Sequence, residues 1–254
     1  MFRFLRQPPK QGGSLDLAPV KAVLFDLDGT LVHVDMQAFI PAYLRRLTAR
    51  LENFAAPNLI AKVLRQLVFE MLSSTEGVRT MEQHLLDGLD EKCNIPAEGY
   101  VAALEEFLSE DLPELQSLVT GHPLARDLVE ACVERDWVPV LATNPIFPRA
   151  AVEARLAWAG LDDLPFALVT TYENARYCKP QHGYFRDVMS TLELAPEACL
   201  MVGNDTEQDL SAGDLGVQTC LLTPWRIDRA GRSYRADWEG EHAELLALLQ
   251  QKTA

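Results

Sequence analysis

The chain reads KAVLFDLDGT over residues 21–30, and this stretch decides how the rest of the sequence is interpreted. The apolar run AVLF ends at turn-forming residues, which is typical of a short strand buried inside a parallel sheet. Asp26 and Asp28 follow two residues apart, so an extended chain points both side chains to one face. Gly29 permits a tight turn, and Thr30 offers a hydroxyl to an anion. The stretch predicts two carboxylates at the strand's carboxyl end, where open parallel sheets bind ligands, although it also fits a plain strand-ending turn.

The overall composition is that of an ordinary globular protein. The 254 residues are 48% hydrophobic and 24% charged, which is too apolar for a disordered chain. Lysine and arginine number 23 against 37 aspartates and glutamates, giving a net charge of −14. A surface this acidic repels phosphate polymers and anionic lipids, so we expect neither nucleic acid nor a membrane as partner.

The cysteines and the first residues carry no strong signal for export. The five cysteines are odd in number, widely spaced and without a CxxC pair, which argues against disulfides and a structural zinc site. Residues 1–20 lack a sustained apolar run and contain several prolines and glycines, so we expect a flexible tail. Reduced, buried thiols in a cytoplasmic protein are the expectation.

Four later apolar runs resemble the first strand and alternate with amphipathic stretches. The predicted strands cover residues 137–142, 166–169, 199–202 and 217–222, and the predicted helices cover 123–135, 148–158, 184–192 and 207–215. A last helix is expected over residues 241–251. Alternation of strands and helices predicts an α/β fold with a doubly wound parallel sheet, covered by helices on both faces.

Residues 36–118 do not follow this alternation, and their pattern predicts helices only. The expected helices are 37–50, 58–72, 81–90 and 98–108, with apolar stripes at Leu44, Leu47 and Leu51 and at Leu59, Val63, Leu67 and Met71. A structureless loop of this length is implausible in a compact domain. We therefore expect an inserted all-helical domain at 36–118, within a core domain formed by residues 21–35 and 119–254.

Polar residues also follow the later predicted strands. Thr143 and Asn144 offer a hydroxyl and an amide to phosphate oxygens, and Lys179 offers a point charge. Residues 203–209 read GNDTEQD, whose carboxylates suit a hard cation such as Mg²⁺. Each signal alone has an ordinary explanation: a turn, a solvated lysine, or acidic residues at a helix N-terminus. Their succession at consecutive strand ends indicates one site.

These four motifs, in this order, resemble those of the haloacid dehalogenase superfamily of phosphohydrolases. The resemblance covers about residues 20–240 and rests on DLDGT at 26–30, Thr143, Lys179 and the GNDTEQD loop. The helical insertion resembles the cap of the first type that phosphoglycolate-phosphatase-like members carry. The resemblance implies a Rossmann-like core with this helical cap.

The resemblance also implies a function. The protein is expected to be a magnesium-dependent phosphatase that hydrolyses a small phosphorylated metabolite, a phosphomonoester, through an aspartyl-phosphate intermediate. Asp26 would be the nucleophile and Asp28 the general acid and base, assisted by Lys179 and Thr143. The residues expected to hold the phosphate are Leu27, Thr30, Thr143, Asn144 and Lys179.

The metal site departs from the commonest pattern of the superfamily at one position. Asn204 stands directly after the glycine, where aspartate is usual, and Asp205 comes one place later. We expect Mg²⁺ to bind the Asp26 carboxylate, the backbone carbonyl of Asp28 and Asp205, with the Asn204 amide oxygen as the competing ligand. Otherwise Asn204 supports the metal ligands from behind, together with Asp209.

Two other functions remain open from the sequence. A phosphomutase of the same superfamily differs in how well the cap excludes water, and a non-catalytic binding or regulatory protein could retain the fold. Thr30 favours hydrolysis over the mutase, and Asp28 disfavours dehalogenation, because a halide leaves without a proton. Candidate contacts for a substrate anion in the insertion are Arg45, Arg46, Arg65 and Arg79, and His33 precedes it on a linker.

Overall fold

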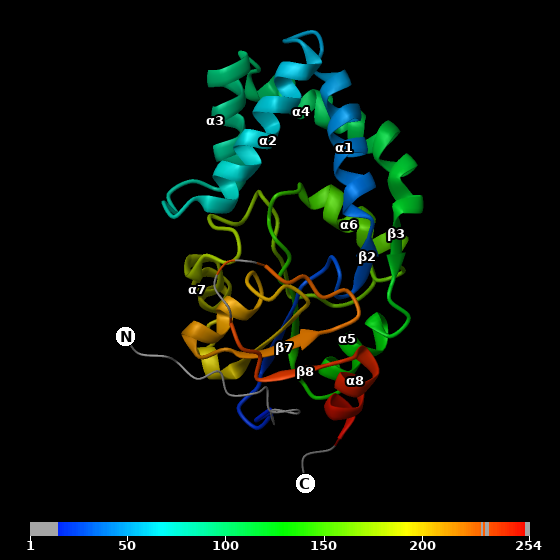
Figure 1. Cartoon of the computed structure of the whole chain (residues 1–254), viewed down its shortest axis with the longest axis vertical. Coiled ribbons are helices and arrows are strands. Elements are labelled where there is room, and N and C mark those ends of the chain that lie inside the picture. Colours follow the sequence, from blue (N-terminus) through cyan, green and yellow to red (C-terminus); the bar gives the residue numbers. More distant parts are fainter. Residues whose placement is uncertain (1–14, 230, 232–233, 252–254) are drawn as a thin grey trace, which may run out of the picture.

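The computed structural model describes residues 15–229, 231 and 234–251. Most of the predicted tail, residues 1–14, lies outside these residues. Six strands form one wholly parallel sheet in the order β5-β4-β1-β6-β7-β8, so the predicted α/β fold is confirmed (Figure 1). The strands are β1 (Ala22–Phe25), β4 (Val138–Leu141), β5 (Leu168–Val169), β6 (Cys199–Gly203), β7 (Gln218–Leu222) and β8 (Trp238–Gly240).

Strand β1 lies in the middle of the sheet, and its side chains alternate between two cores. Val23 and Phe25 belong to the core that includes α5 (Ala125–Val133) and α8 (His242–Gln250). Ala22 and Leu24 face the other core, which includes α7 (His182–Thr191). Helices therefore cover both faces, as in a doubly wound sheet, and the carboxyl end of β1 opens at one edge.

The helical segment, residues 36–118, lies at one end of the molecule, beyond the sheet (Figure 1). It consists of α1 (Met36–Arg50), α2 (Pro57–Ser73), α3 (Met81–Cys93), α4 (Ala97–Glu106), a π-helical turn (Phe107–Asp111) and a 3₁₀ helix (Leu112–Leu118). Local sequence explains the helix starts: Asp35 accepts a hydrogen bond from the Ala38 N–H, and Thr80 forms a capping box with Gln83. Most of the predicted apolar stripe is buried, but Leu59 is 44% exposed and Ile60 is buried instead.

Two short strand pairings are absent from the sequence-based prediction. Strand β2 (Val32–Val34) pairs with β3 (Val119–Gly121) in antiparallel fashion, so these two strands connect the helical segment to the rest of the chain. Strand β8 adds three residues at the edge of the main sheet. Strands of three residues leave too little alternation for a sequence pattern to identify.

The helix predicted over residues 207–215 is wrong. Residues 206–209 form a turn, and only a 3₁₀ helix, η4 (Leu210–Leu215), follows. Asp205 Oδ1 accepts hydrogen bonds from the backbone N–H groups of Glu207 and Gln208, and Asp209 Oδ2 accepts those of Asn204 and Asp205. Aspartate side chains thus bind backbone donors in a non-helical loop, which is why the acidic run does not begin an α-helix.

All five cysteines are free and buried, as predicted. Burial raises the pKa of the Cys178 thiol to about 12 against the opposing charge of Lys179, so this thiol has little nucleophilic character. Among the described residues, no helix combines the length and apolar character needed to cross a membrane.

Candidate active site

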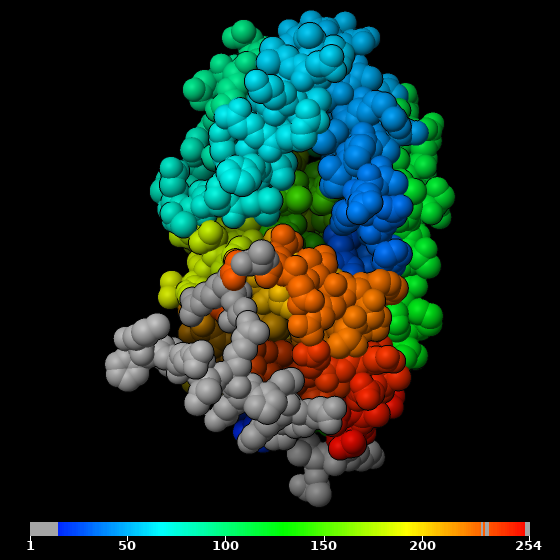
Figure 2. Space-filling model, in the orientation of Figure 1, coloured from blue at the N-terminus to red at the C-terminus, as the bar shows by residue number. Residues whose placement is uncertain are grey.

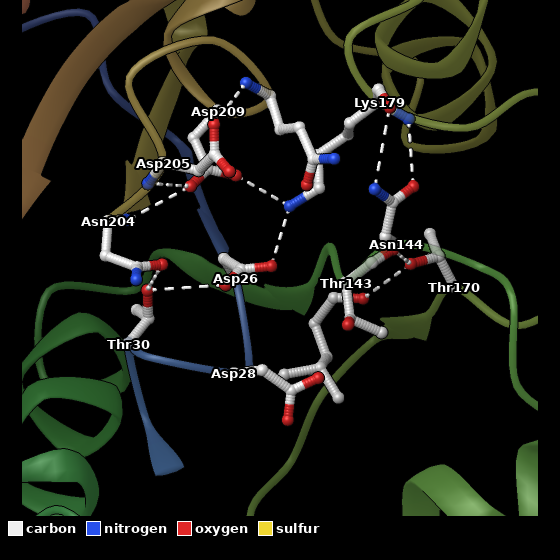
Figure 3. Close-up of polar contacts among 12 residues, drawn as sticks. Asp26, Asp28, Thr30, Thr143, Asn144, Thr170, Lys179, Asn204, Asp205 and Asp209 are labelled. Atoms are coloured by element: carbon white, nitrogen blue, oxygen red, sulfur yellow. Dashed lines mark hydrogen bonds and ion pairs between the residues drawn. The ribbon is translucent and has the colours of Figure 1, made fainter. Parts of the chain in front are cut away.

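Three loops bring a lysine and two aspartates together at the carboxyl end of β1. Asp26 directly follows the strand and is 7% exposed. The Lys179 ammonium lies 2.7 Å from Asp26 Oδ1 and 2.6 Å from Asp209 Oδ1, so it bridges the two carboxylates (Figure 3). The residues quoted from three separate motifs therefore meet in space, although 183 residues separate the first from the last (209 − 26).

Burial perturbs the ionisation of this group. It raises the pKa of Asp26 to about 7; Lys179 acts against this effect, whereas the neighbouring Asp209 adds to it. Burial lowers the pKa of Lys179, but the two carboxylates outweigh burial and hold its pKa above the ordinary value. When all three groups are ionised they carry one net negative charge, which a further cation beside them would offset.

Asp209 organises the GNDTEQD loop from inside. Its Oδ2 accepts hydrogen bonds from the N–H groups of Asn204, at 3.0 Å, and Asp205, at 2.9 Å. Gly203 makes this approach possible, because a Cβ there would lie 2.1 Å from the same carboxylate oxygen. Asp209 thus fixes both the loop and the Lys179 ammonium.

Asn204 and Asp205 point in different directions. Asn204 Oδ1 lies 3.5 Å from the Thr30 hydroxyl, which itself lies 3.5 Å from Asp26 Oδ2 (Figure 3). Asp205 instead directs Oδ1 to backbone N–H groups of its own loop and Oδ2 to Arg229 Nε, at 2.6 Å. The amide oxygen of Asn204 therefore lies toward Thr30 and Asp26, whereas both oxygens of Asp205 are engaged elsewhere.

Asp28 is held apart from this cluster. Its carboxylate points away from the Asp26 and Asp209 carboxylates (Figure 3). Both of its oxygens contact Arg155 Nη1 on α6 (Arg149–Trp158), at 2.8 and 2.6 Å. Sequence reasoning missed Arg155, because an arginine within an amphipathic helix carries no signal of its own.

The loop after β4 contributes structural contacts. The Asn144 side chain accepts a hydrogen bond from the Lys179 N–H at 3.1 Å and donates to the Lys179 carbonyl at 3.5 Å, so it positions the lysine's backbone. The Thr143 carbonyl accepts hydrogen bonds from Thr170 and Tyr184, while its hydroxyl has no partner in the described part of the chain. Leu27 is fully buried, and its carbonyl accepts the N–H groups of residues 30–32 that close the turn.

No group of three or more histidine, cysteine or acidic side chains suited to a metal ion occurs among the described residues. Near Asp26 lie instead the Thr30 hydroxyl, the Asn204 amide oxygen beyond it and, across Lys179, the Asp209 carboxylate, since Asp28 and Asp205 direct their carboxylates to arginines. Such a mixed set of hard oxygen donors still suits Mg²⁺, which keeps several of its waters.

The arginines of the helical segment differ in their partners. Arg46 binds Glu114, and Arg79 binds Asp87. Arg65 lines a cavity of about 140 Å³ between the helical segment and the loop that follows Asn144, and Phe147 lines it from the other side. His33 stacks on Trp225 with ring centroids 4.9 Å apart.

The family is shown by comparison with known proteins. A family model of haloacid dehalogenase-like hydrolases matches residues 20–214, and the chain therefore belongs to this family. The expected family and the hydrolase class are confirmed.

Particular relatives carry the comparison further. The chain is 27% identical to the phosphoglycolate phosphatase of Rhodospirillum rubrum, over 80% of this chain and 79% of that one. It is 24% identical to the pyrophosphatase PpaX of Bacillus cereus, over 85% and 87% of the two chains. The crystal structure of a phosphatase of this family from Thermococcus onnurineus superposes with a TM-score of 0.56 at 20% identity, covering 91% of this chain and 98% of that one.

Proposed function

We propose that the protein is a magnesium-dependent phosphatase that hydrolyses a small phosphomonoester through a phosphorylated Asp26. The observation that carries the proposal is the buried Asp26 carboxylate at the end of β1, with Lys179 2.7 Å away. The phosphatase and pyrophosphatase relatives support phosphoryl chemistry. The five buried thiols suit a cytoplasmic location.

The proposed reaction has two steps. In the first, an Asp26 oxygen forms a bond to phosphorus while the bond to the leaving oxygen breaks, and Asp28 gives that oxygen a proton. In the second, Asp28 takes a proton from water, which attacks the aspartyl phosphate and releases phosphate. Lys179 keeps Asp26 in place and offsets charge on the phosphoryl group, and the Thr143 hydroxyl is available to a phosphoryl oxygen.

The donor set around Asp26 fits Mg²⁺. We propose that the Asp26 carboxylate, the Asp28 backbone carbonyl and the Asn204 amide oxygen hold it. Asn204 is preferred over Asp205, because Arg229 and the loop's own N–H groups engage both Asp205 oxygens. Bound there, the ion supplies the positive charge that the Asp26, Lys179 and Asp209 group lacks and lowers repulsion between carboxylate and phosphate.

We also propose a division of labour between domains. The helical segment, residues 36–118, would act as a cap over a core of residues 21–35 and 119–254. The surface is hollowed between the two (Figure 2), and the paired strands β2 and β3 join them. A cap in this place would exclude water during the first step and select the leaving group.

The deciding experiment is a phosphate-release assay with purified protein on p-nitrophenyl phosphate, small alkyl and sugar phosphates, phosphoglycolate and pyrophosphate. We expect release that requires added Mg²⁺ and stops with EDTA. Asp26→Asn should lose nearly all turnover. Near-normal turnover by Asp26→Asn would refute the mechanism, and glucose 1-phosphate isomerised without phosphate release would indicate a mutase. Failure of the wild type on every substrate would favour the non-catalytic alternative.

A further inference from the structure

The two aspartates of the DLDGT stretch have different basic partners. Asp26 contacts Lys179, whereas both oxygens of Asp28 contact a single nitrogen, Arg155 Nη1, at 2.8 and 2.6 Å. The Asp28 side chain is 20% exposed and the Arg155 side chain is fully buried. Arg155 therefore reaches the reaction side of the sheet from inside the protein.

Further contacts hold the Arg155 guanidinium in one orientation. Its Nε donates to the Ala151 carbonyl at 3.2 Å, and its central carbon lies 4.6 Å from the centroid of the Phe147 ring. Nη2 is buried and has no hydrogen-bond partner among the described residues. One face of the guanidinium is therefore held by Phe147, and Nε is held by the Ala151 carbonyl. Nη1, in this fixed group, is the nitrogen that contacts Asp28.

Stability alone does not explain this arrangement. Burying a guanidinium is costly, and an apolar side chain of similar volume is often as stable in such a place. The unsatisfied Nη2 adds to the cost. Arg149, on the same helix, shows the ordinary alternative: its side chain is 47% exposed and pairs with Glu153 one turn away. The buried arginine is better explained by what it does to Asp28.

We propose that Arg155 is a positioning residue that holds the Asp28 side chain in the orientation for proton transfer to the leaving oxygen. The inference rests on the proposed phosphatase function. Arg155 Nη1 has two hydrogens, so when one Asp28 oxygen carries the proton, the other still accepts from Nη1. As the Asp26–phosphorus bond forms and the bond from phosphorus to the leaving oxygen breaks, the proton passes to the leaving oxygen. Asp28 returns to a carboxylate with both contacts to Nη1.

The test compares leaving groups. Nitrophenolate departs without a proton, whereas an alkoxide needs one, so loss of a positioned acid harms alkyl phosphates selectively. We would measure kcat/KM with Mg²⁺ for p-nitrophenyl phosphate and n-propyl phosphate, because kcat/KM reports steps only up to the cleavage of the leaving group. The variants are Arg155→Met and Arg155→Lys, with Arg149→Met as the matched control on the same helix.

We expect Arg155→Met to lower kcat/KM for n-propyl phosphate by about 10²-fold, and for p-nitrophenyl phosphate by less than about 5-fold. Arg155→Lys should recover part of the lost kcat/KM for n-propyl phosphate, because lysine restores the positive charge but not the planar guanidinium. Arg149→Met should match the wild type on both substrates.

Equal losses on the two substrates, or no loss on either, would overturn the inference. If Arg155→Met does not fold, as judged by circular dichroism, the same comparison with Arg155→Lys decides. A wild-type protein that hydrolyses neither substrate would refute the proposed function itself, which is a different outcome from an active wild type with unselective variants.

Discussion

The strand-end cluster and the helical segment use charge in opposite ways. In the strand-end cluster, which comprises Asp26, Lys179, Asn204, Asp209 and Thr30, every member is buried. In the helical segment the acidic partners of the arginines are mostly exposed: Arg50, itself 25% exposed, contacts Glu106 and Glu110, whose side chains are 62% and 64% exposed. The inner side of the segment presents an apolar cavity.

This difference teaches where each part of the function resides. Buried charges are costly to separate, so the strand-end cluster holds its geometry and suits chemistry that repeats on any phosphate. Exposed ion pairs are screened by water and contribute little to stability, so the helical segment can change its surface at small cost. Under the proposed function, an apolar inner wall would discriminate among leaving groups by size rather than by charge.

The largest expected effect comes from breaking the strand-end cluster at its only cation. Lys179→Met leaves the Asp26 and Asp209 carboxylates buried without their shared partner. We expect it to lower the free energy of unfolding by about 3–5 kcal/mol at pH 8 and to abolish phosphatase turnover. Urea denaturation followed by circular dichroism measures the first effect, and phosphate release measures the second.

The destabilisation by Lys179→Met should depend on pH. The pKa of Asp26 is about 7 in the folded protein, above its ordinary value of 3.8, so the folded state takes up a proton as the pH falls through 7. The destabilisation by Lys179→Met should therefore be smaller at pH 6 than at pH 8.

Lys92→Met, in the helical segment, removes only two long contacts of a half-buried side chain, at 4.0 Å to Glu70 and 3.9 Å to Glu91, and should cost little. Equal stability of Lys179→Met and Lys92→Met would contradict the contrast between the two regions.

A smaller loss of stability is expected from substituting Gly29, whose missing side chain allows the loop after β1 to pack against Asn204. Gly29 has a φ of +88°, and a Cβ there would lie 2.1 Å from the Asn204 side-chain nitrogen. Gly29→Ala should lower the free energy of unfolding by about 3 kcal/mol, because backbone strain adds to the cost of displacing Asn204. The displaced Asn204 should also raise the Mg²⁺ concentration needed for half-maximal activity. Isothermal titration with Mg²⁺ checks the second effect independently of turnover.

A variant at Gly160 separates the effect of backbone strain from the effect of displacing Asn204. It also has a positive φ, +67°, but nothing lies within 4 Å of a Cβ built there. Gly160→Ala should therefore cost only the strain, about 1 kcal/mol, and leave Mg²⁺ binding unchanged. If the two alanine variants had the same stability and Mg²⁺ affinity, contact with Asn204 would not explain the glycine at position 29.

The sequence predicted the strand-end cluster well because its information is local. The apolar run before Asp26 specifies a buried strand, and parallel strands bring their carboxyl ends to one edge. The sequence alone therefore places Lys179 and Asp209 near Asp26. Burial of Leu47, Leu67 and Met71 followed in the same way from helical periodicity.

What the sequence did not predict depends on contacts that no pattern encodes. Arg155 and Asp28 are 127 residues apart, and Arg229 reaches Asp205 from a loop with no motif. The choice between Asn204 and Asp205 turns on which side chain the loop's own N–H groups engage, a matter of atomic geometry. The misjudged helix after Asp205 has the same origin.

The smallest expected effect concerns the cavity between the helical segment and Phe147. Because Ile146, which also lines it, is three residues from Thr143, chain geometry puts this wall within about 11 Å of the proposed phosphate site. At about 140 Å³, the cavity is close to the size that accommodates a benzene molecule. In a series of n-alkyl phosphates, we expect kcat/KM to rise about 4-fold per added methylene until the cavity is filled, following about 0.8 kcal/mol per buried methylene.

Leu44 and Leu59 offer a matched pair of variants for this series. Leu44 lines the cavity, whereas Leu59, in the same helical segment, is 44% exposed and is not among the residues that line it. Leu44→Phe should flatten the dependence on chain length while leaving methyl phosphate hydrolysis near normal, and Leu59→Phe should change neither. An active wild type with no chain-length dependence would show that the leaving group does not enter the cavity. Selection would then have to come from polar groups of the helical segment, and Arg65, which lines the cavity, is the first residue to substitute.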